Sequence, residues 1–320
     1  MNKYAIAGVL NNPAKTKNSH SAGYIRHFGN KLFAGEPYDI ITEEHDWTKY
    51  GYVAIHHGPN FKPGMFNVVG GIGEKLIKRY NRFIEACNSL TRVVVFDGFN
   101  LEDLYEKRLK KYMEKTNTSI QAPDCKYIIG PENYLEKREH DIIYVGDSHI
   151  FSIASAESDL IYRPGKTLYG FLKNPYSIYQ PEFLTEKVTF YFGNIDVRFH
   201  LPRQKDPIKA TEDLVRHYYD YTREFGDVKV CSLLPIEPES RKIPGSGKYQ
   251  GQGFYGSQQL REDIVDVFNG ELVYYFGSEN VLTWPTEWYE NPEWYMKNVM
   301  EPRQSVHVRP RYYKHYKNLF

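Results

Sequence analysis

Residues 141–149 read Asp-Ile-Ile-Tyr-Val-Gly-Asp-Ser-His. The run 141–145 has the apolar character of a strand in a buried parallel sheet. A glycine that permits a tight turn follows, and we predict a helix from there through residue 156. Strand, turn and helix in this order are typical of an open α/β sheet, in which ligands bind at the carboxyl ends of the strands. Ser148 is therefore expected at that edge of the sheet.

The same alternation of strands and helices runs on both sides of this stretch. The regions predicted as strands are 4–10, 38–41, 52–56, 93–96, 160–163, 187–192, 228–234 and 281–284. The predicted helices cover 72–87, 101–113, 208–225 and 257–268. Between 116 and 139 the sequence becomes polar and contains proline, which indicates a domain boundary. We therefore predict two three-layer α/β domains, 1–138 and 139–320, each Rossmann-like or flavodoxin-like with a mostly parallel sheet.

The composition narrows the classes of function. The chain has 320 residues, with 41 Lys and Arg against 40 Asp and Glu, so no overall charge attracts nucleic acid or membranes and only a local basic patch could do so. Its three cysteines are far apart and favour a reducing compartment. The short apolar run at the start is expected to be a strand and not a signal peptide, which predicts a cytoplasmic protein. GxGxxG occurs only at 251–256, in a glycine-rich loop that does not directly follow a predicted strand, and no GxxxxGK[ST] motif is present, so we expect no cofactor.

Ser148 is the candidate nucleophile. The backbone N–H groups at the start of a helix, with their positive potential, can stabilise an oxyanion that forms beside the serine. A serine also needs a base to remove its proton, and that histidine must come from elsewhere in the fold. Gly, Asp and Ser are also common in ordinary turns, which is the alternative interpretation of this motif.

Four blocks between about 140 and 310 resemble those of the SGNH (GDSL-like) hydrolases, a family with a flavodoxin-like sheet and a Ser-His-Asp site. The first, Gly146-Asp147-Ser148, matches the Gly-Asp-Ser block, and Gly193-Asn194-Ile195-Asp196 is similar to the Gly-x-Asn-Asp block. Near the end of the chain, Gln304-Ser305-Val306-His307 is similar to the Asp-x-x-His block. The resemblance implies that Ser148 is the nucleophile and His307 the base. It also implies a glycine after the second strand whose N–H binds the oxyanion, for which we choose Gly170, with Gly165 as the alternative.

Two positions depart from the family pattern. The oxyanion asparagine would fall at Ile195, whereas Asn194 stands one position earlier, and in an extended segment it would point the other way. The aspartate of the triad would fall at Gln304, which cannot offset the charge of an imidazolium. The carboxylate could then come from Glu301 or Asp196, or the site could operate as a Ser-His dyad. A domain that binds without hydrolysing is the third alternative.

Several further residues are candidates for contacts with a substrate. Asp147 and His149 adjoin the serine, and His149 is expected to cover the start of the helix. Arg198 and His200 alternate with apolar residues as at the end of a half-buried strand, where Arg198 suits a carboxylate or phosphate. A structural ion pair is the competing interpretation for Arg198.

The N-terminal domain has its own candidates. Residues 38–64 and 93–97 resemble, in outline only, the N-terminal Rossmann-like domain of bacteriophage DNA glucosyltransferases. The candidates that follow predicted strands there are His56, His57, Asn60 and Asp97. They could contact an acceptor or a nucleotide, or simply cap loops.

The first functional hypothesis is a serine hydrolase or acyltransferase that acts on an ester-linked acyl group of a small molecule or carbohydrate. The second is a glycosyltransferase-like enzyme that uses a nucleotide sugar between two domains, in phage nucleic-acid modification. The third is a catalytically inactive binding protein. Whether the source is viral or cellular stays open.

Overall fold

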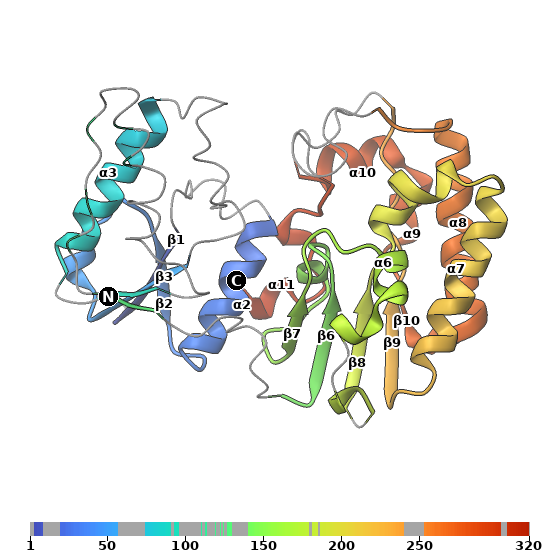
Figure 1. The fold of residues 1–320 in the computed structure, drawn as a ribbon, viewed down its shortest axis with the longest axis horizontal. Coiled ribbons are helices and arrows are strands. Elements are labelled where there is room, and N and C mark those ends of the chain that lie inside the picture. The colour runs from blue at the N-terminus through green and yellow to red at the C-terminus, as the bar shows by residue number, and fades with distance from the viewer. Residues whose placement is uncertain are drawn as a thin grey trace. The chain divides into compact units, whose positions relative to one another are not determined.

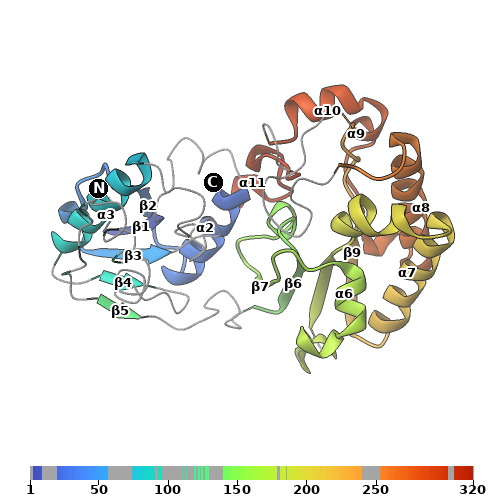
Figure 2. The same ribbon diagram turned by 45° about the horizontal axis from the view of Figure 1, so that its top comes forward.

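The computed structural model describes residues 3–8, 20–56, 74–90, 93–95, 110, 113, 119, 122, 124, 127–129, 140–178, 181–184, 186–239, 253–301 and 306–319. The chain divides into two compact units, Met1–Lys137 and Arg138–Phe320. Each is built on one parallel sheet with helices packed around it (Figures 1 and 2). The α/β class with parallel sheets is therefore confirmed. Within the described ranges, no helix has the length and apolar character needed to cross a bilayer.

The sheet of the first unit has five parallel strands in the order β2-β1-β3-β4-β5. They are β1 (Tyr4–Gly8), β2 (Tyr38–Ile41), β3 (Tyr52–His56), β4 (Val93–Val95) and β5 (Tyr127–Ile129). Two helices accompany them, α2 (His20–Leu32) and α3 (Glu74–Asn88). All but one of the strands agree with the predicted ones to within a few residues.

Two elements of this unit were not predicted. Strand β5 lies inside the segment that its polar composition assigned to a linker, because a three-residue strand is too short to show an alternating pattern. Helix α2 buries Ile25 and Phe28, but its two glycines and its basic residues obscure the helical period. The predicted helix 101–113 falls almost entirely outside the described residues.

The sheet of the second unit carries the candidate site. Its strands are β6 (Ile142–Gly146), β7 (Asp159–Tyr162), β8 (Lys187–Tyr191), β9 (Asp227–Cys231) and β10 (Val281–Leu282). They are all parallel, in the order β10-β9-β8-β6-β7. Counted from the first strand of the unit this is 2-1-3-4-5, the order of flavodoxin-like sheets, and the direction of winding reverses between β6 and β8. A ligand site is expected at the carboxyl ends of those two strands.

Helices cover the sheet and bury its apolar side chains. The longest are α7 (Pro207–Thr222) and α8 (Gln258–Phe276), which lie side by side in Figures 1 and 2. Asp206 caps α7 by accepting a hydrogen bond from Lys209 N at 3.0 Å, as the Asp-Pro pair predicted. Helix α8 runs eight residues past its predicted end at 268. The shorter helices are α6 (Leu168–Lys173), α9 (Thr286–Glu290), α10 (Pro292–Asn298) and α11 (Tyr316–Leu319).

Two predictions of local structure near Ser148 were wrong. The helix expected through residue 156 is a single 3₁₀ turn, Ile150–Ser152. The segment Asp196–His200, expected as the end of a strand, is a short π-helix that begins directly after the β8 turn. The alternation of apolar and polar residues in this segment does not indicate a strand. The segment is a buried turn of helix, and the surrounding structure covers its side chains on several sides.

Candidate active site

The site lies at the point where the winding of the second sheet reverses. Gly146, the last residue of β6, pairs with Tyr191 of β8. A Cβ atom at Gly146 would lie only 2.6 Å from the carbonyl oxygen of Tyr191, so the close approach of the two strand ends requires glycine. Asp147, Ser148 and His149 follow β6, and Asn194 follows β8 within three residues. The two sequence blocks thus meet at the edge where ligands bind in such sheets.

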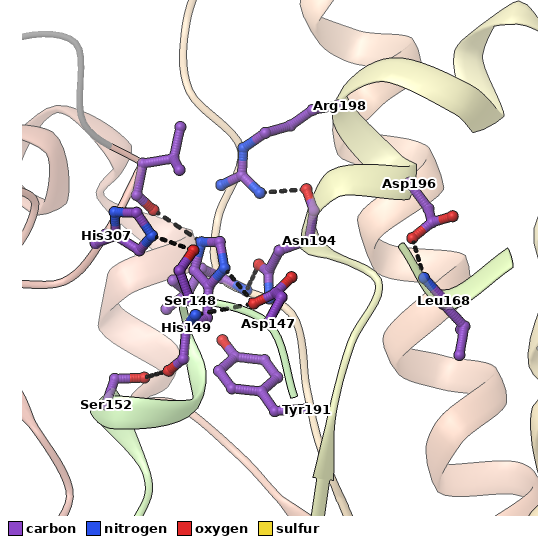
Figure 3. Close-up of polar contacts among 12 residues, drawn as sticks. Asp147, Ser148, His149, Ser152, Leu168, Tyr191, Asn194, Asp196, Arg198 and His307 are labelled. Carbon is purple, nitrogen blue, oxygen red and sulfur yellow. Dashed lines mark hydrogen bonds and ion pairs between the residues drawn. The ribbon is translucent and has the colours of Figure 1, made fainter. Parts of the chain in front are cut away.

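His307 contacts Ser148 directly. Its Nε2 atom lies 2.6 Å from Ser148 Oγ, although the two residues are 159 positions apart in the chain (Figure 3). Both residues are partly exposed. A histidine nitrogen within hydrogen-bond reach of a serine hydroxyl is the arrangement in which the imidazole removes the serine proton.

The segment around His307 is held by backbone hydrogen bonds. Glu301 N donates to the carbonyl oxygen of His307 at 2.9 Å, and Arg309 N donates to Val299 O at 2.8 Å. Met300 and Val308 form an antiparallel bridge between these contacts. His307 therefore sits on a short two-stranded ladder, with Glu301, one of the two candidate acids, directly opposite in the backbone pairing.

His149 forms a second link to the same segment. Its Nδ1 atom lies 2.8 Å from Asp147 Oδ1, and its Nε2 atom lies 3.1 Å from the carbonyl oxygen of Val306. Its ring also packs against the His307 ring, with 4.7 Å between centroids. Since both polar partners are acceptors, the ring donates to both only when it carries two N–H protons. His149 and the buried Asp147 thus fix the residue that precedes His307, and both side chains face inward.

Asn194 lies on a turn that brings it into the core. Gly193 has φ of +105°, a backbone conformation that L side chains rarely adopt, and a Cβ atom there would meet the Phe268 ring at 2.7 Å. Asn194 is fully buried, and its Oδ1 accepts a weak hydrogen bond from Leu234 N at 3.5 Å. Its Nδ2 lies near the Tyr191 hydroxyl but makes no hydrogen bond of good geometry within the described ranges. The chain therefore does not stay extended here, which removes the geometric objection to Asn194.

Arg198 is part of a buried ion pair. Its Nε lies 3.0 and 2.8 Å from the two carboxylate oxygens of Glu237, and Nη2 lies 2.6 Å from Oε1. Nη1 donates to the backbone carbonyl of Asn194 (Figure 3). Both charged side chains are buried. Arg198 therefore ties the Asn194 turn to the segment after β9, and the predicted role in binding a substrate anion is replaced by the structural ion pair.

Asp196 points away from the serine and histidine, toward Leu168 (Figure 3). Its carboxylate accepts hydrogen bonds from Leu168 N at 2.7 Å and Tyr169 N at 3.2 Å, so it caps the start of α6. Burial raises the pKa of Asp196 to about 7, against the lowering effect of these N–H donors. Asp196 is therefore not the triad acid, and its carboxyl group supports the start of α6 instead.

The backbone N–H of Gly170 is already used. It donates to Thr167 Oγ1 at 2.9 Å inside the first turn of α6, which leaves no proton for an oxyanion. Gly165, the alternative, has φ of +73° and is exposed. Neither glycine is therefore assigned a role in the site.

His200 is half-buried at the end of the π-helix, and its carbonyl oxygen accepts a hydrogen bond from Gln204 Nε2.

Other predicted positions fall outside what the structure describes. These are His57, Asn60, Asp97, Gln304 and the side chain of His56. In the described ranges, no three His, Cys, Asp or Glu side chains group as metal ligands would.

Two contributors to the site were missed in the sequence. Glu237 gave no signal because a carboxylate in a loop after a strand is common, and only the fold brings it to Arg198. The carbonyl oxygen of Val306 is a backbone atom, so no residue type could reveal it. The Asp147–His149 contact had a local signal, because the two residues are only two positions apart.

Comparison with known proteins finds few matches. No protein-family model matches the chain, and no curated protein matches it. Among solved structures the chain is similar to a protein of Parabacteroides merdae described as a GDSL-like lipase. The TM-score is 0.36 and the identity 13%, with 57% of this chain and 95% of that chain covered. It is also similar to phospholipase A1 from Streptomyces albidoflavus, with a TM-score of 0.25, 13% identity, and 44% and 77% of the two chains covered.

The description of the first match names a GDSL-like protein, the class that the sequence blocks resemble. The likeness of the first unit to phage DNA glucosyltransferases stays a prediction. Matches at these TM-scores carry no argument about activity. The function proposed below therefore rests on the geometry of the site.

Proposed function

We propose that the second unit is a serine hydrolase or acyltransferase that cleaves an ester-linked acyl group. The observation that carries the proposal is the 2.6 Å contact between His307 Nε2 and Ser148 Oγ at the carboxyl edge of the sheet. The contact joins a nucleophile to a base at the position where a doubly wound sheet binds ligands.

In this mechanism Ser148 Oγ attacks the ester carbonyl while its proton passes to His307 Nε2. The ester C–O bond then breaks, and His307 returns the proton to the departing alkoxide. Water, or an acceptor hydroxyl, then gives a proton to His307 and attacks the acyl-serine. The bond between Ser148 Oγ and the acyl carbon breaks, His307 returns the proton to Ser148 Oγ, and the acid or the new ester is released. A positioned base of this kind contributes about 10²- to 10⁴-fold to the rate.

Two donors are proposed for the oxyanion. The first is the backbone N–H of Ser148, at the start of the turn that follows β6. The second is Asn194 Nδ2, which is buried, lies near the Tyr191 hydroxyl and makes no hydrogen bond of good geometry among the described residues. A buried amide N–H without an acceptor is unfavourable, so an oxyanion would supply the partner that it lacks.

The acyl donor proposed first is an ester of a carbohydrate or glycoconjugate, the substrate class that the resemblance to SGNH hydrolases implies. Acetylated sugars and 4-nitrophenyl acetate are therefore the first substrates to compare.

The test is a burst experiment with 4-nitrophenyl acetate. Wild-type protein should release close to one equivalent of 4-nitrophenol rapidly and carry an acetyl group on Ser148, located by mass spectrometry of peptides. Ser148→Ala should abolish both signals, whereas Ser278→Ala, at an exposed position, should leave them unchanged. An acetyl group on another residue, or full hydrolysis by Ser148→Ala, would refute the proposal.

A further inference from the structure

Besides Arg198, this unit contains another buried arginine, Arg261, and two of its nitrogen atoms have no hydrogen-bond partner among the described residues. Arg261 lies in the first turn of α8 and is fully buried. Its Nη1 donates to the carbonyl oxygen of Gly256 at 2.9 Å and lies 3.8 Å from Glu239 Oε1. Its Nε and Nη2 atoms are buried and have no hydrogen-bond partner in the part of the chain that the structure describes. Arg198, by contrast, uses the same two atoms on Glu237.

The two unpartnered atoms form one donor edge. Nε–H and one N–H of Nη2 point in parallel from the same side of the guanidinium plane, and this fork fits two oxygens of a carboxylate or phosphate. The Phe254 ring lies 4.6 Å from the guanidinium carbon and holds the plane of Arg261 in place. Arginine stays charged even where burial lowers its pKa, as it does here. A charged fork is thus fixed in orientation and has no acceptor.

The position of Arg261 relates this fork to the site. Phe268 is seven residues further along α8 and lies on the same face of the helix. Its ring packs against Gly193, where it would be the group nearest to an added Cβ atom. Two helical turns correspond to about 10 Å, so Arg261 lies about that far along α8 from Phe268. Arg261 thus shares a helix face with the residue that packs against the Gly193 turn.

Carboxylates near Arg261 leave its Nε and Nη2 edge without a hydrogen-bonded partner among the described residues. Glu237 is already paired with Arg198, so those two charges offset each other. Glu239 faces Nη1, the opposite edge, and its side chain is 58% exposed, which weakens its interaction with Arg261. Glu262, which accepts a hydrogen bond from Gln258, is a third carboxylate near Arg261, but no described residue forms a hydrogen bond with the Nε and Nη2 edge.

We propose that Arg261 is an anion-binding residue that takes a carboxylate or phosphate group carried by the substrate of the Ser148 site. The attribution to the substrate rests on the function proposed above, whereas anion binding at Arg261 does not. The shared chemistry is an oxyanion that presents two oxygens to the guanidinium fork.

The binding test uses Ser148→Ala, so that no reaction intervenes. Its melting temperature is measured with increasing succinate or inorganic phosphate, and sodium chloride keeps the ionic strength constant. One of the two anions should raise the melting temperature, and the responding anion distinguishes a carboxylate from a phosphate ligand. Adding Arg261→Met should weaken the binding of that anion about 10- to 100-fold, which corresponds to the loss of a charge-assisted bidentate contact. The matched control, Arg216→Met, removes an exposed arginine of α7 and should leave the response unchanged.

The same variants separate a binding role from a structural one. Without added anion, Arg261→Met should melt at the same or a higher temperature, because it removes a buried charge with unpaired donors. Arg261→Lys keeps the charge but loses the fork, so it should also bind the anion more weakly, and it serves if Arg261→Met does not fold. The proposal is overturned if neither anion stabilises the protein, or if Arg261→Met and Arg261→Lys respond as strongly as the parent.

Hydrolysis distinguishes failure of the inference from failure of the proposed function. The mono-4-nitrophenyl ester of succinic acid should be favoured over 4-nitrophenyl butyrate in kcat/KM by wild type but not by Arg261→Met. Anion binding without hydrolysis of any ester would refute the hydrolase proposal and retain the anion site. Hydrolysis without anion binding would refute the anion site alone.

Discussion

Replacement of His149 by alanine tests whether Asp147 and His149 position the base. The substitution removes a hydrogen bond between His149 and the Asp147 carboxylate, one to Val306 O, and the ring contact with His307. A charge-assisted hydrogen bond contributes about 1.5–3 kcal/mol and a neutral one about 0.5–1.5 kcal/mol. Because such contacts are not strictly additive, the expected loss in the free energy of unfolding is about 2–4 kcal/mol.

The same substitution should slow the chemistry. Val306 immediately precedes His307, so loss of its contact frees the base to shift relative to Ser148 Oγ. A displacement of about 1 Å of a reacting group can cost about 10²-fold in rate. We therefore expect His149→Ala to react with a fluorophosphonate about 10- to 100-fold more slowly at a temperature where it is fully folded.

The assay combines urea unfolding with the rate of fluorophosphonate labelling. His217→Ala, which removes an exposed histidine of α7, is the matched control and should change the free energy of unfolding by less than about 0.5 kcal/mol. A His149→Ala protein that is destabilised but labels at the wild-type rate would refute the positioning role. If both stability and rate were unchanged, the contacts themselves would be refuted.

Three further predictions concern the turn after β8. Arg198→Met leaves the buried Glu237 carboxylate unpaired and should lower the free energy of unfolding by about 3–5 kcal/mol in urea titrations, and a second change, Glu237→Leu, should recover most of that loss. The native Asp196 carboxyl, with a pKa near 7, keeps its proton over a pH range in which the unfolded chain, at 3.8, has lost it. Stability should therefore fall as the pH rises from about 4 to 7, by at most about 1.4 kcal/mol per pH unit, and Asp196→Asn should flatten this dependence in melts at several pH values. Gly193→Ala forces an unfavourable φ and a clash with Phe268, so thermal melts should show a loss of about 1–3 kcal/mol.

The order of strands and turns in the second unit could be predicted from its sequence, because glycine and polar residues follow directly where the apolar runs end. The apolar run before Gly146 and the one before Gly193 both end in a turn, and parallel strands place such turns at one edge. The sequence could also pair Ser148 with a distant histidine, since a serine nucleophile requires one. That His307 reaches the hydroxyl is a result of the fold, because 159 residues separate the two.

The local geometry could not be read in the same way. The segment Asp196–His200 alternates as a strand would, and only the burial of Arg198 with Glu237 explains an arginine among apolar residues. Similarly, Gly170 matched a block by its place after the second strand, but Thr167 occupies its N–H. Such roles depend on which backbone groups are already bonded, and residue type alone does not record that.

The most direct test of the central claim is labelling with a fluorophosphonate probe, which reacts only with an activated serine. Wild-type protein should be labelled at Ser148, and labelling should be lost in Ser148→Ala and reduced at least about 100-fold in His307→Ala. Absence of labelling in the folded wild-type protein, or labelling that persists in Ser148→Ala, would contradict a Ser148–His307 active site.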